Sequence, residues 1–225
     1  MTYPTHYPVW NCPKKIEARE QTIILTYREF YQRESISEDK QYWTMSGSYE
    51  DDNHNPIEGE FHQLKNNMFL LKDSNFHAVD ISSDIIQNNK KHYPNLNWHC
   101  GDFLDTMKEF SINNCFNAAI VNCDNVRLPG RGSVYLASLL MFLENNVEDE
   151  VMVVSNLMLN HPYHKSVVAE GQNIIDLLLP IYDFTEQWYT LPYCYKYHGS
   201  GTKAKTWMGS IIFIKKGKIT KTVKI

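Results

Sequence analysis

The sequence predicts an α/β fold with three layers: a doubly wound, mostly parallel sheet, helices on both faces, and an antiparallel β-hairpin at the C-terminal end. Strand-like and helix-like segments alternate five times between residues 41 and 182. Two of the strand-like runs, AAIV at 118–121 and VMVV at 151–154, are continuously apolar, as in strands covered on both sides. Two further strand-like segments, joined by HGSGTKAK, predict the closing hairpin.

The individual elements follow from apolar periodicity and from residues that start or stop helices. After a Tyr- and Pro-rich arm, residues 14–34 have the pattern of one amphipathic helix. We assign residues 1–40 to an N-terminal arm and helix, and residues 41–225 to the main domain. Strands are expected at 41–47, 76–82, 96–103, 116–125, 149–159, 185–197 and 206–216. Helices are expected at 58–70, 83–94, 104–110, 133–146 and 166–182, with Ser82 or Ser83 capping the second of these.

Composition excludes several classes of protein. No apolar run approaches the roughly 18 residues that cross a bilayer, so we expect no membrane association. The N-terminus has no secretory signal pattern, and the five cysteines are scattered without a C-x-x-C pair. We therefore expect a cytoplasmic protein with reduced thiols and no metal site.

Charge is distributed unevenly along the chain. Residues 1–186 hold all 26 acids and 14 of the 22 Lys and Arg, a net charge of −12, whereas residues 187–225 hold eight lysines and no acid. The basic end could bind nucleic acid, where interleaved aromatic residues would stack on an unpaired base. Lysines also protect exposed strand edges from pairing, which explains the same pattern without a partner.

Acidic and amide side chains fall at the carboxyl ends of the predicted strands. Asp80 ends the second strand and Asp102, 22 residues later, ends the third. Asn122 and Asp124 end the fourth. In open α/β sheets, ligands bind outside the carboxyl ends of the strands, where a carboxylate can accept hydrogen bonds from ribose hydroxyls. An aspartate in this position can also cap the following helix, so each acid alone has a structural explanation.

This order of strand ends resembles the class I S-adenosylmethionine-dependent methyltransferases over residues 41–214. The resemblance implies S-adenosylmethionine as cofactor. It implies that Gly47 contacts the methionine portion, that Asp80 and Ile81 hold the ribose, and that Asp102 holds the adenine, with Phe103 offering a ring face. Asn122 and Asp124 match the position that faces the transferred methyl group, so they are the catalytic candidates.

The first loop departs from the family pattern. Three closely spaced glycines usually follow the first strand, whereas SGSYEDDNHNPIEGEF contains only Gly47 and Gly59. Either this loop is remodelled and still binds the cofactor, with Glu58 or Glu60 near the cofactor's amino group, or the scaffold has lost the cofactor.

The resemblance leaves the methyl acceptor open. Enzymes that methylate amino groups of DNA often carry Asn or Asp followed by Pro-Pro and an aromatic residue after the fourth strand. NCDNVRLPG keeps only the polar start of that pattern. Nucleic acid is the first candidate acceptor, then a small molecule or a protein. The alternative is a non-catalytic module that binds partners through its basic C-terminal hairpin.

Overall fold

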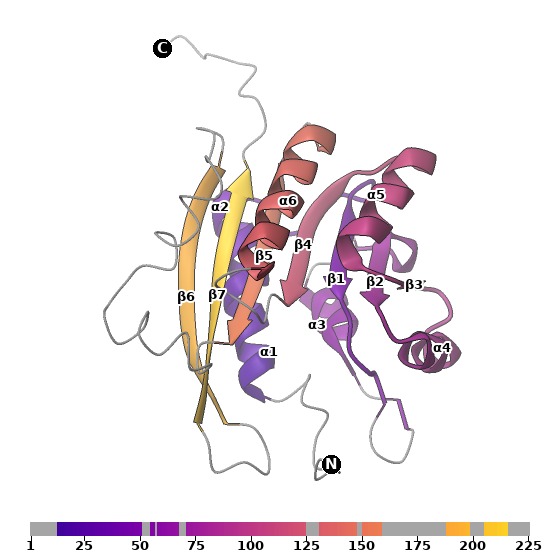
Figure 1. Ribbon diagram of the computed structural model, residues 1–225. Helices are drawn as coiled ribbons and strands as arrows, with labels where there is room; N and C mark the ends of the chain where they lie inside the picture. The colour runs from indigo at the N-terminus through magenta and orange to yellow at the C-terminus, as the bar shows by residue number, and fades with distance from the viewer. Residues whose placement is uncertain are drawn as a thin grey trace.

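The protein is built around one seven-stranded sheet with the strand order β3-β2-β1-β4-β5-β7-β6 (Figure 1). The computed structural model describes residues 13–50, 55–56, 58–67, 71–124, 131–147, 150–158, 188–198 and 205–215. The strands are β1 Gln41–Met45, β2 Phe76–Asp80, β3 Asn97–Cys100, β4 Ala118–Asp124, β5 Val151–Met158, β6 Trp188–His198 and β7 Lys205–Lys215. This confirms the predicted α/β sheet.

Strand directions also agree with the prediction. The five strands β1 to β5 pair in parallel, and β7 pairs antiparallel with both β5 and β6. The sequence predicted a closing hairpin but not that β7 would lie between β5 and β6. The chain reverses its direction of travel across the sheet between β1 and β4, where Thr44 and Asn122 are register partners. Such a reversal is where sheets of this kind bind ligands.

Helices cover both faces of the sheet. They are α1 Pro13–Arg19, η1 Glu20–Leu25, α2 Thr26–Tyr31, α3 Glu60–Asn67, α4 Ser83–His92, α5 Phe103–Asn113 and α6 Arg131–Asn146, with a short 3₁₀ turn, η2, at Asp73–Asn75. Ser82, one of the two expected residues, caps α4. The helix predicted at 166–182 lies outside the described residues. None of the helices in the described part of the chain is long and apolar enough to cross a membrane.

The N-terminal helical segment differs from the single α-helix that was predicted. Its middle, η1, is π-helical, and the Thr26 hydroxyl donates to the Gln21 carbonyl five residues back (2.8 Å). Three consecutive residues of η1, Thr22 to Ile24, are buried. The segment ends at Tyr31 rather than Glu34, because Gln32 has the left-handed conformation (φ 53°).

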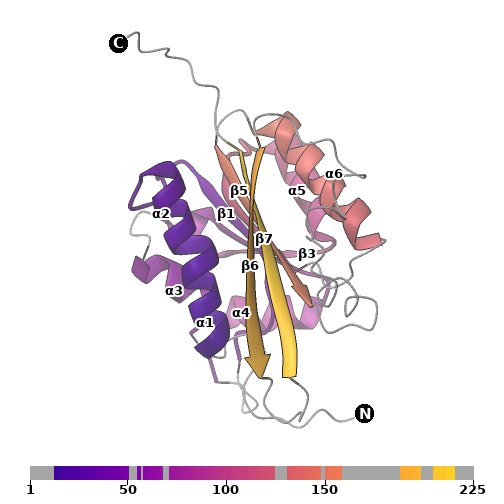
Figure 2. The same ribbon diagram turned by 90° about the vertical axis from the view of Figure 1, so that its left-hand side faces the viewer.

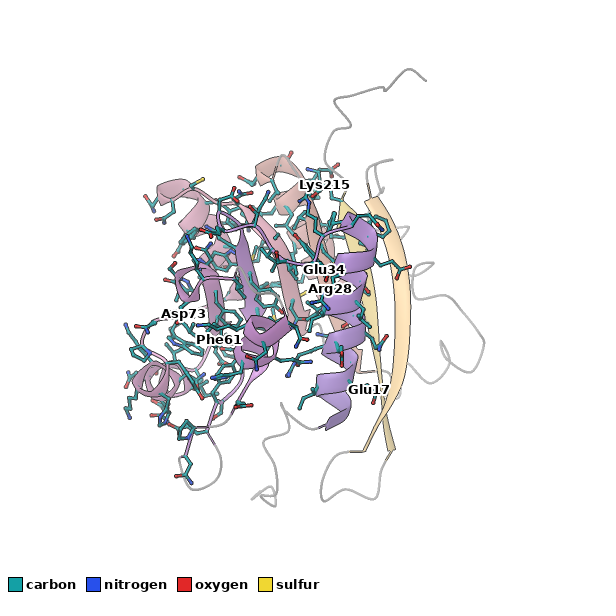
Figure 3. All side chains as sticks on the ribbon, turned by 180° about the vertical axis from the view of Figure 1, so that it is seen from behind. Glu17, Arg28, Glu34, Phe61, Asp73 and Lys215 are labelled. Atoms are coloured by element: carbon teal, nitrogen blue, oxygen red, sulfur yellow. The ribbon has the colours of Figure 1, made fainter. Side chains whose placement is uncertain are left out.

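Two hydrophobic clusters lie on opposite faces of the sheet. Figure 2 shows the helices that cover these faces, with α5 and α6 on one side and α1, α2 and α3 on the other. One cluster joins α5 and α6 to the face that carries Trp43 and Val121. The other joins α2, η1 and α3 to the face that carries Tyr42 and Ile120. Figure 3 looks onto this second face, with Phe61 of α3 labelled. Because the second cluster contains residues from both sides of position 40, the N-terminal helix is part of the same hydrophobic core as the sheet.

Candidate cofactor and acceptor site at the carboxyl edge of the sheet

Asp80 is the last residue of β2, and its side chain is half-buried at the carboxyl edge of the sheet. Its Oδ1 accepts a hydrogen bond from the Ser82 N–H (2.8 Å). Burial raises the pKa of this carboxyl group, while hydrogen bonds from the backbone N–H groups of Ser82 and Ile81 act in the opposite direction. Ile81 is 82% exposed, so a carboxylate and a large apolar side chain adjoin at the surface.

The turn between β3 and α5 is built on Gly101. This residue has φ +157°, and a Cβ atom there would lie 3.1 Å from the Thr106 hydroxyl, so glycine fits best. Its N–H donates to the Asp80 carbonyl (3.0 Å), which ties the ends of the two neighbouring strands together. The turn therefore places Asp102 on the same edge as Asp80.

Asp102 is the N-cap of α5. Its Oδ1 accepts hydrogen bonds from the N–H groups of Leu104 (3.0 Å) and Asp105 (3.1 Å) and from the Tyr135 hydroxyl (3.2 Å). The capping role that the sequence suggested is thus observed. All three bonds use one oxygen, and within the described residues Oδ2 accepts none, so it is available to a ligand.

Phe103 is placed differently from what the resemblance implied. Its side chain is 3% exposed and packs in the cluster beneath α5 and α6. The ring is therefore part of the core and offers no face to a ligand at this edge. Only the backbone of Phe103 can contribute there.

The loop that follows β1 is attached to α4. The Asn89 side chain, which is fully buried, donates to the Gly47 carbonyl (2.9 Å) and accepts from the Tyr49 N–H (2.8 Å). The Glu50 carboxylate and the His92 ring, 2.8 Å apart, add a second attachment. The first part of this loop, residues 47–50, is therefore held by α4 rather than shaped by a run of glycines.

Gly59, the other glycine of this loop, allows a close approach. A Cβ atom at this position would lie 2.7–2.9 Å from three carbons of the Tyr49 ring, a distance that real Cβ atoms do not reach. The Tyr49 ring is buried between Gly59 and the edges of Tyr93 and Trp98. Gly59 thus permits the close packing of the Tyr49 ring against the backbone.

At the β1–β4 reversal, Asn122 lies beside a buried carboxylate. Glu60, the first residue of α3, accepts hydrogen bonds from Asn122 Nδ2 (2.9 Å) and the Thr44 hydroxyl (3.2 Å). Asn122 itself is 6% exposed. Asp124 is the last residue of β4, two positions further along the strand, and its side chain lies outside the described part of the structure.

Two further groups contact Glu60. The Tyr42 hydroxyl donates to its Oε1, and Arg19 Nε lies 3.8 Å from its Oε2. Burial, and then the charge of Glu60, raise the pKa of Tyr42 far above its ordinary value, so the phenol stays protonated and acts as the donor. Three hydrogen-bond donors and one guanidinium therefore surround this carboxylate, and each of its oxygens accepts at least one hydrogen bond.

The hydrogen bonds continue from Asn122 across the sheet. Asn156 on β5 donates through Nδ2 to Asn122 Oδ1 (2.8 Å), and the Ser210 hydroxyl on β7 donates to Asn156 Oδ1 (2.7 Å). Of the residues in this series of hydrogen bonds, the sequence indicated only Asn122 and Glu60. Thr44, Asn156 and Ser210 are polar residues within largely apolar strands, which was the available signal.

No sequence family and no curated protein matches this chain. Its structure is similar to that of the precorrin-6y C5,15-methyltransferase of Geobacter metallireducens (TM-score 0.50, 10% identity, 96% of this chain and 93% of that one). It is also similar to the plantazolicin methyltransferase BpumL in complex with a triazolic desmethylPZN analog and SAH (TM-score 0.56, 12% identity, 92% of this chain and 86% of that one). This chain has the class I methyltransferase fold.

Within the methyltransferase fold, the predicted positions are only partly brought together. Asp80, Ile81 and Asp102 lie on adjacent strand ends on one side of the reversal. Asn122 lies at the reversal itself, bonded to Glu60. Among the described residues, no group of three or more His, Cys, Asp or Glu is arranged to hold a metal ion. The candidate site is therefore one of carboxylates and amides along the carboxyl edge of β2, β3, β1, β4 and β5.

Proposed function

We propose that this protein is an S-adenosylmethionine-dependent methyltransferase. The observation that carries the proposal is a pair of carboxylates, Asp80 and Asp102, on adjacent strand ends beside the β1–β4 reversal. Each carboxylate bonds to backbone N–H groups of its own turn and can still accept further hydrogen bonds. The exposed Ile81 beside Asp80 supports it, because a large apolar side chain at 82% exposure is suited to contact a flat ring system.

The residues present fit the nucleoside part of the cofactor. Asp80 would accept hydrogen bonds from ribose hydroxyls, and Asp102 Oδ2 would accept one from the adenine amino group. When bound, the sulfonium supplies the methyl group, and the protein's task is to align the acceptor and exclude water. For the methionine part the fit is weaker, because the Gly47 carbonyl and the Tyr49 N–H are already bonded to Asn89.

Nucleic acid remains our first candidate acceptor, and the eight lysines of residues 187–225 are the feature that supports it. One of them is excluded from such contact: Lys215 is buried, and its ammonium donates to the carbonyls of Val147 and Glu144 at the end of α6. A small molecule or a protein is the next candidate. The side chains of the other seven lysines lie outside the described part of the structure. If they bind phosphates, the affinity for nucleic acid should fall with salt.

A non-catalytic binding module is the second candidate. It is favoured by the state of Asn122, whose amide nitrogen and oxygen are both bonded within the protein. In such a module Asn122 would have a purely structural role. The loop attached to Asn89 would no longer bind the cofactor. Such a module would bind its partner without binding the cofactor.

Calorimetric titration with S-adenosylhomocysteine separates the two functions. The enzyme predicts saturable binding that Asp80→Asn weakens at least about tenfold, as expected from losing a charged hydrogen bond. Asp84→Asn, the same change four residues later on exposed α4, is the matched control and should bind normally. No heat with the unaltered protein rejects the proposal. Methyl transfer from labelled cofactor to mixed RNA, DNA and protein then identifies the acceptor.

A further inference from the structure

A one-way chain of hydrogen bonds runs across the sheet from β7 to α3. Ser210 donates to Asn156, Asn156 to Asn122, and Asn122 to Glu60, over distances of 2.7, 2.8 and 2.9 Å. Ser210, Asn122 and Glu60 are buried, while Asn156 is only half-buried. Asn156 is therefore the member of the chain that a ligand can reach.

The carboxylate of Glu60 sets the direction of this chain. An ionised carboxylate can only accept hydrogen bonds, so the Asn122 atom that faces it must be the amide nitrogen. The hydroxyl groups of Tyr42 and Thr44 also donate to Glu60, and the Arg19 guanidinium lies 3.8 Å from its Oε2, as expected for a carboxylate that only accepts. Glu60 also begins α3, where a negative charge is favoured.

The orientation of each following group is then determined. With its nitrogen on Glu60, Asn122 turns its oxygen toward β5, where it accepts from the Asn156 nitrogen. With its nitrogen on Asn122, Asn156 turns its oxygen toward β7, where it accepts from Ser210. One charge on α3 thus fixes the orientation of an amide two strands away.

Within the described residues, one N–H of the Asn156 side chain is unused. Its amide nitrogen has two hydrogens, and only one is given to Asn122. Among the described residues none accepts the second. Asn156 lies next to Asp124, the end of β4, in the β4–β5 register. The family resemblance assigns Asp124 to the position that faces the transferred methyl group, so Asn156 lies beside that position.

We propose that Asn156 binds the methyl acceptor through this second N–H, and that Glu60, acting through Asn122, is a positioning residue that holds Asn156 in the required orientation. The acceptor bears a hydrogen-bond-accepting oxygen, such as a carbonyl, close to the atom that is methylated. This inference rests on the proposed function for the identity of the ligand as an acceptor, whereas the one-way chain is a property of the protein alone.

The one-way chain is tested by NMR of the free, ¹⁵N-labelled protein. The side-chain amide signals of Asn122 and Asn156 are assigned by their loss in Asn122→Ser and Asn156→Ser. Glu60→Gln should shift both pairs of signals and speed their exchange with solvent at least about tenfold, since a neutral amide no longer fixes the direction. Glu109→Gln, the same change on an exposed position of α5, should shift neither. If only the Asn122 signals shift, the one-way chain of hydrogen bonds is ruled out.

Ser210→Ala tests the same chain from its other end and keeps Glu60 intact if Glu60→Gln does not fold. It should shift the Asn156 amide signals, and unchanged signals count against the chain. Neither measurement needs cofactor or acceptor, so failure of cofactor binding in the unaltered protein rejects the proposed function and leaves this result standing.

Contact with the acceptor is tested with Asn156→Ala. Affinity for S-adenosylhomocysteine should stay within about twofold of the unaltered protein, and the KM for the acceptor found in the transfer assay should rise at least about tenfold, as for a lost hydrogen bond to a buried group. An unchanged KM for the acceptor overturns the assignment of Asn156. A loss of cofactor affinity equal to the loss of transfer overturns it as well, because that result indicates a structural role.

Discussion

The Tyr135 hydroxyl on α6 donates a hydrogen bond to Asp102 Oδ1 at the start of α5 (3.2 Å). The same hydroxyl accepts a hydrogen bond from the Leu104 N–H (2.9 Å). Burial raises the pKa of Tyr135 above its ordinary value, so the hydroxyl donates to Asp102 over the usable pH range. A side chain of the next helix therefore completes the cap of α5, which sequence reasoning assigned to Asp102 alone.

Tyr135→Phe removes this hydrogen bond and keeps the ring. We expect the free energy of unfolding to fall by about 1 kcal/mol, because the Leu104 N–H still has Asp102 as an acceptor. Urea unfolding followed by circular dichroism measures the change. An effect above about 3 kcal/mol would mean that the ring itself is displaced, since a single hydrogen bond does not account for that much.

Asp102→Asn separates the cap from the cofactor site. Asn is as good an N-cap as Asp, so the free energy of unfolding should stay within about 0.5 kcal/mol. With its oxygen held on the cap, the amide nitrogen replaces Oδ2 and turns a donor toward the adenine amine, so affinity for S-adenosylhomocysteine should fall at least about tenfold. Asp102→Ala should lose both stability, by about 1 kcal/mol, and affinity. Unchanged affinity in Asp102→Asn would limit this residue to capping.

Gly59→Ala places a methyl group within 2.7–2.9 Å of the Tyr49 ring. The buried ring cannot retreat freely, so we expect a loss of about 1–3 kcal/mol in the free energy of unfolding. Tyr49→Leu should remove most of this cost in the double variant, because the smaller side chain leaves space for the added methyl group. Equal costs of Gly59→Ala with and without the ring would show that backbone conformation, not contact with Tyr49, requires glycine.

His77 should make stability depend on pH. Its ring is buried between Trp43 and Phe110 and lies 3.1 Å from His99, and burial, then the neighbouring His99, lower its pKa to about 3. The unfolded chain takes up the proton near pH 6.5, so stability is complete above that pH and decreases as the pH falls from 6.5 toward 3.

His77→Phe tests this dependence and keeps an aromatic ring against Trp43. Between pH 6.5 and 4, we expect the unfolding free energy of the variant to depend less steeply on pH, because nearly one proton fewer is taken up on unfolding. The difference amounts to a few kcal/mol over that range. Urea titrations at several pH values give the slope. The same slope in both proteins would assign the acid sensitivity to other groups, of which His99 is the nearest.

Much of the fold could be predicted from local sequence. The alternation of strand and helix, the buried runs at 118–121 and 151–154, and the turn residues around Ser82 and Gly101 each depend on neighbours in the chain. The positions of Asp80 and Asp102 follow from where their strands end, so the sequence alone located both carboxylates on the carboxyl edge.

What only the tertiary structure decided depends on residues far apart in the chain. Asn89 holds Gly47 from 42 positions away, and Glu60 binds Asn122 from 62 positions away. No local pattern encodes which side chains a buried donor will meet once the sheet closes, so the burial of the Phe103 ring, the place of β7 and the chain to Asn156 were decided by packing. Strand ends are local because they depend on backbone propensity, whereas the chemistry between them is set by the order in which the strands assemble.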